Sequence, residues 1–141
     1  MTQSHAEIAA LIRGMYRAFA DGDPAGIEAA LHPDATVWDV FTPQLIRGRA
    51  EREAFHAADQ AQKNARGRLS FTVSEPLVDV WGDVAVARYE LDFRYEPPNA
   101  TAGRVRITDV LGQVDGRWRI VHHHEGLVPA GVPPIDDPPA G

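Results

Sequence analysis

The spacing of apolar residues changes at Leu69, and this change constrains the fold more than any other feature of the sequence. Before it, five apolar residues recur at the spacing of one helix face: Ile8, Leu11, Ile12, Met15 and Phe19. After it, apolar residues alternate with charged ones, as in a half-buried strand: Ala87, Tyr89, Leu91, Phe93 and Tyr95. Helices followed by antiparallel strands predict an α+β fold with the helices on one face of a curled sheet.

Turn and capping residues divide the chain into elements. Gly22 ends the first helix, and Asp23 followed by Pro24 predicts the start of a second helix. The alanine-rich segment 48–67 predicts a third helix, and residues 34–41 predict a strand between the second and third. Four further strands are expected over 69–81, 84–96, 104–113 and 117–127, with a bend or sheet edge at Pro76.

Composition limits the classes of protein to which the chain can belong. With 141 residues, 44% hydrophobic and 24% charged, it predicts one globular domain, over 1–127. The net charge of −6 argues against a nucleic-acid or membrane-surface protein, and no apolar run reaches the ~20 residues that span a bilayer. The absence of cysteine excludes disulfides and thiolate metal sites and is compatible with a cytoplasmic location.

The last segment, 128–141, contains five prolines and few residues to bury. Such a composition predicts an extended tail without a core of its own. No repeat and no second domain are expected.

Three consecutive histidines, His122 to His124, form the most conspicuous motif. Strand alternation predicts that His123 faces the opposite side from its two neighbours, so the three cannot bind one metal ion. The outer two have a spacing that strands offer to zinc, but no third ligand is evident, and we expect no metal site. Alternation also predicts an outer apolar stripe, and hence a homodimer through it: Trp118, Ile120, His122 and His124.

The hairpin between the last two strands decides which of their residues meet. A three-residue loop at 114–116 predicts three facing pairs: Asp109 with Val121, Ile107 with His123, and Val105 with Glu125. A two-residue loop would instead pair Asp109 with His122. We favour the longer loop. We also expect His123 and Glu125 to be too far apart to work as a pair, since alternate strand residues lie ~6.5 Å apart.

The segments "DGDPAGIEAALHPDATVWD" and "DGRWRIVHHH", in this order of elements, resemble the SnoaL-like proteins of the nuclear transport factor two-like superfamily. The resemblance covers residues 5–127. It implies a cystatin-like cone, in which a curved antiparallel sheet wraps the helices of the N-terminal half and leaves a hydrophobic pocket at its open end. Members often dimerise through the outer face of the sheet. They include steroid isomerases, polyketide cyclases, dehydratases and proteins that only bind.

The ketosteroid isomerases of this superfamily imply roles for particular residues. Their catalytic base corresponds to Asp39, at the end of "DATVWD", and a second catalytic carboxyl corresponds to Asp109. Their oxyanion-stabilising tyrosine falls at Met15, with Tyr16 about 100° further around the helix and Tyr89 as a substitute. The predicted pocket residues are Met15, Tyr16, Tyr89, Ile107, Val121, His123 and Glu125.

Two functions therefore remain open. One is a cofactor-free isomerase, cyclase or dehydratase acting on a hydrophobic carbonyl compound, with one ionised and one neutral carboxyl. The other is a non-catalytic module that binds a small hydrophobic ligand or dimerises. Asp39 fits either function, because it could equally cap a turn before "FTPQ".

Overall fold

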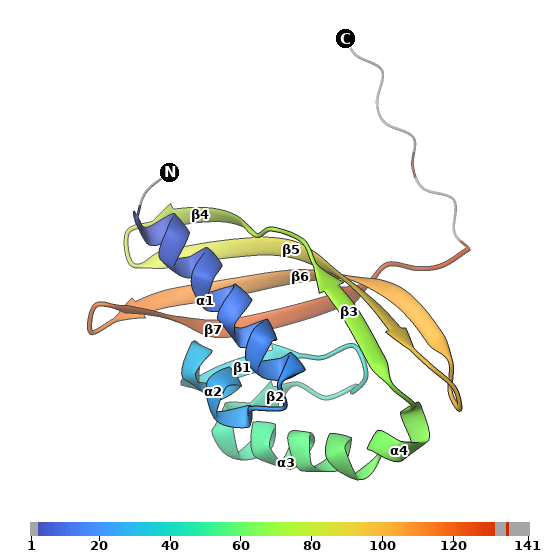
Figure 1. Cartoon of the computed structure of the whole chain (residues 1–141). Helices are drawn as coiled ribbons and strands as arrows, with labels where there is room; N and C mark the ends of the chain where they lie inside the picture. Colours follow the sequence, from blue (N-terminus) through green and yellow to red (C-terminus); the bar gives the residue numbers. More distant parts are fainter. Residues whose placement is uncertain (1–2, 132–134, 136–141) are drawn as a thin grey trace.

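The structure, a computed structural model, describes residues 3–131 and residue 135 (Figure 1). The helices are α1 (Gln3–Ala20), α2 (Pro24–Ala30), α3 (Gly48–Ala61) and α4 (Lys63–Arg66). The strands are β1 (Leu31–Trp38), β2 (Ile46–Arg47), β3 (Leu69–Val73), β4 (Leu77–Trp81), β5 (Val84–Tyr95), β6 (Thr101–Val114) and β7 (Arg117–Leu127). Most of the proline-rich segment 128–141 lies outside the described residues.

The strands form one curved seven-stranded sheet, which confirms the α+β, cystatin-like fold. Its order is β2-β1-β7-β6-β5-β3, and β4 also pairs with β5. The sheet is mixed rather than wholly antiparallel, because β1 runs parallel to β7. More than half of the chain lies between these two strands. They are therefore not joined by a tight hairpin, which would make them antiparallel. No helix among the described residues is long and apolar enough to cross a membrane.

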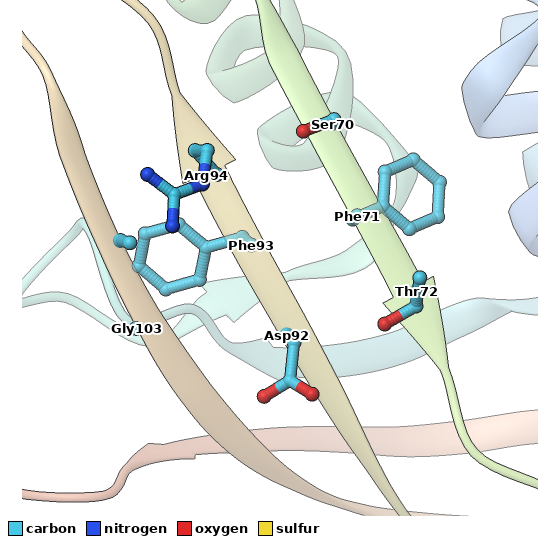
Figure 2. Close-up of a pocket in the computed structure, with 8 residues that line it drawn as sticks. Ser70, Phe71, Thr72, Asp92, Phe93, Arg94 and Gly103 are labelled. Atoms are coloured by element: carbon cyan, nitrogen blue, oxygen red, sulfur yellow. The ribbon is translucent and has the colours of Figure 1, made fainter.

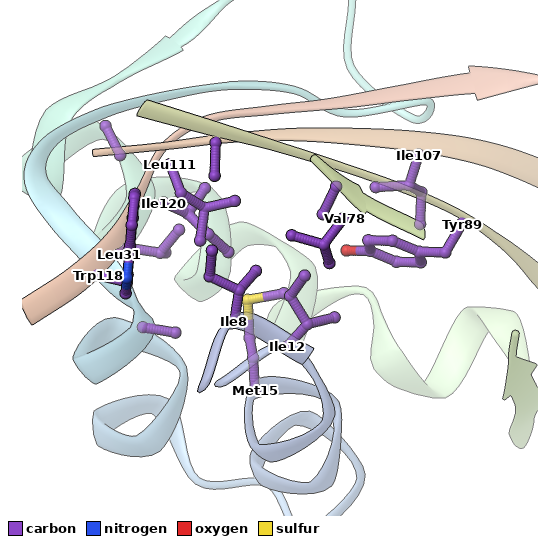
Figure 3. Close-up of a cluster of buried hydrophobic side chains, with 14 of the residues drawn as sticks. Ile8, Ile12, Met15, Leu31, Val78, Tyr89, Ile107, Leu111, Trp118 and Ile120 are labelled. Carbon is purple, nitrogen blue, oxygen red and sulfur yellow. The ribbon is translucent and has the colours of Figure 1, made fainter. Parts of the chain in front are cut away.

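Helix α1 crosses one face of the sheet, and its apolar stripe forms the core as the periodicity predicts (Figure 1). Ile8 and Ile12 are completely buried, and Figure 3 shows them facing Leu111 and Ile120 of the sheet. Helix α2 begins as predicted, with the Asp23 carboxylate accepting a hydrogen bond from the backbone N–H of Gly26 at 3.2 Å. The core therefore fixes the first half of α1 on the sheet.

Two predicted elements are interrupted. The helix expected over 48–67 is α3 followed by the short α4, and the strand expected over 69–81 is β3 and β4. The break between these strands includes Pro76, which has no N–H to donate to a sheet. There the Ser74 hydroxyl accepts a hydrogen bond from the Glu90 N–H at 2.9 Å.

The hairpin between β6 and β7 differs from the expectation. Val114 pairs with Arg117, which leaves a two-residue loop of Asp115 and Gly116, both with positive φ (53° and 74°). Further along, Leu111 pairs with Ile120 but Val110 pairs with His122. The three-residue loop and its register are therefore wrong, and Val121 is the extra residue of a β-bulge.

Because of this bulge, the predicted outer stripe is wrong. An extra residue reverses the alternation of faces, so Trp118 and Ile120 point into the core (5% and 0% exposed) while His122 and His124 point outward. His123 is buried on the inner side, as predicted. The stripe of Trp118, Ile120, His122 and His124 therefore does not exist as one surface.

Candidate functional site

A cavity of about 1260 Å³ lies between the helices and the inner face of the sheet. This is large enough for a ligand of several fused rings. All five phenylalanines of the chain and two of its three tyrosines line it: Phe19, Phe41, Phe55, Phe71, Phe93, Tyr16 and Tyr95. These rings give the wall a large aromatic area, which favours a flat, hydrophobic occupant.

Two carboxyls meet at one side of this cavity. Asp39 follows the last residue of β1, and Glu125 lies on β7. The parallel register pairs Trp38 with His124, so the next residue of each strand lies beside the other on the inner side. Both carboxyls line the cavity, and neither would be near the other without the β1–β7 pairing.

The buried imidazole of His123 joins two carboxylates. Its Nδ1 atom lies 2.5 Å from Asp109 Oδ1 and its Nε2 atom lies 3.1 Å from Glu125 Oε2. Burial by itself would lower the pKa of His123, but these two carboxylates outweigh burial and raise the pKa to about 10. His123 is therefore an imidazolium at neutral pH. The expectation that His123 and Glu125 are too far apart is wrong, because their side chains span the distance that separates their backbones.

Asp109 is completely buried on β6 and connects His123 to two tyrosines. The Tyr89 hydroxyl donates a 2.6 Å hydrogen bond to Asp109 Oδ2, and the Tyr16 hydroxyl lies 3.0 Å from the Tyr89 hydroxyl. Burial raises the pKa of both phenols, so they remain protonated. A continuous hydrogen-bonded network thus runs from Tyr16 through Tyr89, Asp109 and His123 to Glu125.

Asp39 combines the turn role and the pocket role. Its Oδ1 atom accepts a 2.8 Å hydrogen bond from the backbone N–H of Phe41, and its side chain also lines the cavity. Burial and the negative charge of Glu125 raise its pKa to about 7. The pKa of Glu125 moves in the opposite direction: burial opposes its ionisation, but the hydrogen bond and charge of His123 lower its pKa. Near neutral pH, Asp39 is therefore protonated in part of the molecules and ionised in the rest, so it can donate or accept a proton.

The predicted site residues divide into three groups. Five line the cavity: Met15, Tyr16, Asp39, His123 and Glu125. Tyr89 and Asp109 lie behind that wall and reach it through hydrogen bonds. Ile107 and Val121 are not among the described residues that line the cavity: Ile107 belongs to the core, and the bulge places Val121 against Gly112.

The sequence did not identify Arg52, which is 7% exposed on α3 and forms part of the cavity wall. Its Nε and Nη2 atoms donate to the two carboxylate oxygens of Glu28 at 2.9 and 2.7 Å, and its Nη1 atom donates to the carbonyl of Ala35. This bidentate pair fixes α3 to α2 and β1. No sequence pattern distinguishes Arg52 from Arg49, the exposed arginine of the same helix.

Two other features lie away from this network. Figure 2 shows a smaller hollow of about 360 Å³ over β3, β5 and β6, where Asp92 is exposed and bonded to Arg104 at 2.8 Å. On the outer face, His122 Nδ1 lies 2.6 Å from the Thr36 hydroxyl. Throughout residues 3–131, no three histidine or acidic side chains are grouped in a way that could hold a metal ion.

Comparison with known proteins gives a family for this arrangement. A model of the SnoaL-like domain matches residues 8–130. The chain belongs to the SnoaL-like domain family. A steroid Δ-isomerase of Nocardioides simplex is 43% identical over 53 residues, which are 38% of this chain and less than half, 43%, of that enzyme.

Solved structures share the fold of this SnoaL-like protein at low identity. An NTF2-like protein of unknown function from Pseudomonas putida has a TM-score of 0.73 at 22% identity, covering 89% of this chain and 87% of that chain. The CaMKII hub of S. rosetta has a TM-score of 0.71 at 19% identity, covering 87% and 95%. Such different proteins on one fold mean that function must be argued from the site.

Proposed function

We propose that this SnoaL-like protein is a cofactor-free acid–base enzyme acting on a hydrophobic carbonyl compound. The observation that carries the proposal is Asp39, a carboxyl with a pKa of about 7 in the wall of an aromatic cavity. A carboxyl with a pKa near the working pH is an efficient proton acceptor and donor. The partial match to a steroid Δ-isomerase supports the same chemistry, a proton transfer beside a carbonyl.

Each polar residue has a role in this proposal. Asp39 removes a proton from the carbon beside the carbonyl, and the Tyr16 hydroxyl donates a hydrogen bond to the enolate oxygen that forms. Asp109, which the resemblance makes a catalytic carboxyl, acts here through Tyr89 as a positioning residue, since it is fully buried behind the wall. Tyr16 thus takes the role that the family's tyrosine has at the Met15 position.

Deuterium exchange tests this proposal without knowledge of the natural substrate. β-Tetralone, a bicyclic ketone, is incubated with the protein in D₂O, and NMR follows the loss of protons beside the carbonyl. We expect exchange well above the buffer rate, rising with pH through about 7 as Asp39 ionises. Asp39→Asn should lower the exchange rate ~10²-fold or more. Glu75→Gln, exposed between β3 and β4, is the control and should have no effect.

The alternative is a module of the same fold that binds a hydrophobic ligand without reacting. The cavity would serve binding equally well, and the fold is shared with a CaMKII hub. β-Tetralone that binds, with line broadening in its NMR spectrum, but does not exchange its protons would favour this alternative over the enzyme.

A homodimer through the outer face of the sheet belongs to the same proposal, with a corrected set of residues. Large apolar side chains of β1 and β4 remain exposed on that face: Trp38 (40%), Leu77 (64%) and Trp81 (60%). Soluble monomers seldom expose side chains of this kind, and Leu77 and Trp81 share one face of β4. We expect the dimer to act in the cytoplasm, where proteins generally do not depend on disulfides for stability.

A further inference from the structure

We propose that Glu125 is a second catalytic carboxyl, and that with Asp39 it fits the cavity to eliminate water from β-hydroxy ketones. This inference rests on the proposed acid–base function and adds a reaction and a substrate class to it. An isomerase needs only one carboxyl to move its proton, from one carbon to another, and a second one serves only to stabilise the enolate. Elimination of water benefits from two, one to accept a proton and one to donate it.

The contacts of the two carboxyls assign them different states. Glu125 accepts hydrogen bonds at both oxygens, from the Val40 N–H at 3.2 Å and from His123 Nε2 at 3.1 Å. Its side chain is nevertheless 19% exposed and lines the cavity, so it can reach a ligand. Asp39 accepts one backbone hydrogen bond, from Phe41. Donors stabilise an ionised carboxylate, so Glu125 is already ionised where Asp39 still keeps its proton. Glu125 is therefore the group that can accept a proton while Asp39 donates one, and ionised Asp39 is the stronger base once the pH rises.

Charge balance leads to the same assignment. Asp39, Asp109 and Glu125 would together carry three negative charges beside the single positive charge of His123. A net charge of −2 in a largely apolar enclosure is costly, and one retained proton reduces this net charge to −1. Asp109 is held by Tyr89 and His123, and Glu125 by His123 and Val40, so the proton is placed at least cost on Asp39.

The reaction balances with these groups alone. Glu125 takes the proton from the carbon beside the carbonyl, and the C–H electron pair passes to the carbonyl oxygen, where Tyr16 donates a hydrogen bond. The enolate then re-forms the carbonyl and the new C=C bond, while the C–O bond to the hydroxyl breaks. Asp39 protonates the departing hydroxyl to give water. Proton transfer from Glu125 to Asp39 restores both carboxyls, and no other reactant is needed.

Two probes separate this inference from the general acid–base proposal. Exchange of β-tetralone protons reports a base, whereas loss of water from the aldol adduct of acetone and β-naphthaldehyde requires base and acid and yields a conjugated ketone with a strong ultraviolet band. We expect exchange to rise with pH through about 7 and dehydration to fall over the same range, because dehydration requires protonated Asp39.

Substitution of Glu125 is the decisive measurement. In Glu125→Gln, we expect dehydration to fall ~10²-fold or more while β-tetralone exchange continues, with its midpoint moved to lower pH because the neighbouring charge is gone. Glu125→Asp, measured alongside in case the glutamine variant misfolds, should lower dehydration more than exchange. Glu7→Gln, exposed on α1, is the control and should change neither rate.

Each other result overturns the inference. Exchange without dehydration in the wild type, dehydration that rises with pH, or equal loss of both activities in Glu125→Gln would leave the acid–base proposal standing and remove the role of Glu125. Absence of both activities in the wild type would remove both proposals together.

Discussion

The imidazole of His123 and the carboxylate of Asp109 face each other across β6 and β7, with Nδ1 and Oδ1 2.5 Å apart and both side chains buried. Removal of Asp109 leaves the buried imidazolium with Glu125 as its one remaining carboxylate partner, and loss of one member of a buried ion pair is strongly destabilising. We therefore expect Asp109→Ala to lower the free energy of unfolding by about 3–5 kcal/mol, measured by urea denaturation.

An exposed carboxylate that also forms an ion pair provides the control. Glu75 bonds Arg13 at 2.8 Å with both side chains at least half exposed. Solvent screens such pairs, so Glu75→Ala should cost less than about 1 kcal/mol. Similar losses in the two variants would contradict the view that burial makes the His123–Asp109 pair essential.

The raised pKa of His123 predicts how stability depends on pH. Its folded-state pKa of about 10 exceeds the unfolded value of 6.5, so the folded state binds the proton more tightly. This contribution is complete below pH 6.5 and is lost as pH rises through about 10. The thermal midpoint of unfolding should therefore decrease as the pH rises from 7 to 10. In His123→Gln, this decrease should be much smaller. The raised pKa of Asp39 does not affect this test, because its contribution to stability is lost between about pH 4 and pH 7, below the range measured.

Tyr16 should have a larger effect on catalysis than Tyr89. In the proposed mechanism, the Tyr16 hydroxyl contacts the developing oxyanion and Tyr89 only orients it, at 3.0 Å. Loss of one oxyanion donor typically costs 10²–10³-fold in kcat. We expect Tyr16→Phe to lower the β-tetralone exchange rate by about this factor and Tyr89→Phe to lower it less. The reverse order would mean that Tyr16 is a wall residue only.

Arg52 and Arg49 form a matched pair, because both lie on α3 and both approach Glu28. Arg52 is 7% exposed and bidentate, whereas Arg49 is 64% exposed and its Nε lies 4.0 Å from the carboxylate. Arg52→Ala should lower the free energy of unfolding by about 3–5 kcal/mol and Arg49→Ala by less than about 1 kcal/mol. Urea denaturation of the two variants measures this difference directly.

The proposed dimer predicts a mass of two chains in sedimentation at micromolar concentration. Trp81→Arg and Leu77→Arg place charges on the outer face and should give monomers that keep the wild-type circular dichroism spectrum. Ile135→Arg, at a residue 96% exposed beyond β7, should leave the dimer intact. A wild-type protein that sediments as one chain would contradict this interface.

Much of the architecture could be predicted, because the determining interactions are local. The stripe through Ile12 on α1 and the alternation through Ala87 on β5 each follow from the period of one element, and both are buried as expected. The cap at Asp23 and the break near Pro76 likewise depend on neighbouring residues only.

The site depended on pairings between distant segments. The inward placement of His123 was predicted, but its partners were not, because the register of β7 against β6 includes a bulge at Val121 that no local pattern marks. This bulge also turned Trp118 into a core residue. One residue more or fewer in a strand moves every later side chain to the opposite face of the sheet. A one-residue error in register therefore assigns all of these side chains to the wrong face.

The sequence by itself determined the order of helices and strands, the apolar faces of α1 and β5, and that Asp39, Tyr16 and His123 belong near one pocket. Only the tertiary structure decided that Asp39 lies beside Glu125 and that Tyr16 reaches Asp109 through Tyr89. Periodicity is a property of one strand or helix, whereas a pair of carboxyls with different pKa values exists only where two strands meet. The parallel pairing of β1 with β7 brings them together. Burial raises the pKa of Asp39, whereas the hydrogen bond and charge of His123 lower the pKa of Glu125.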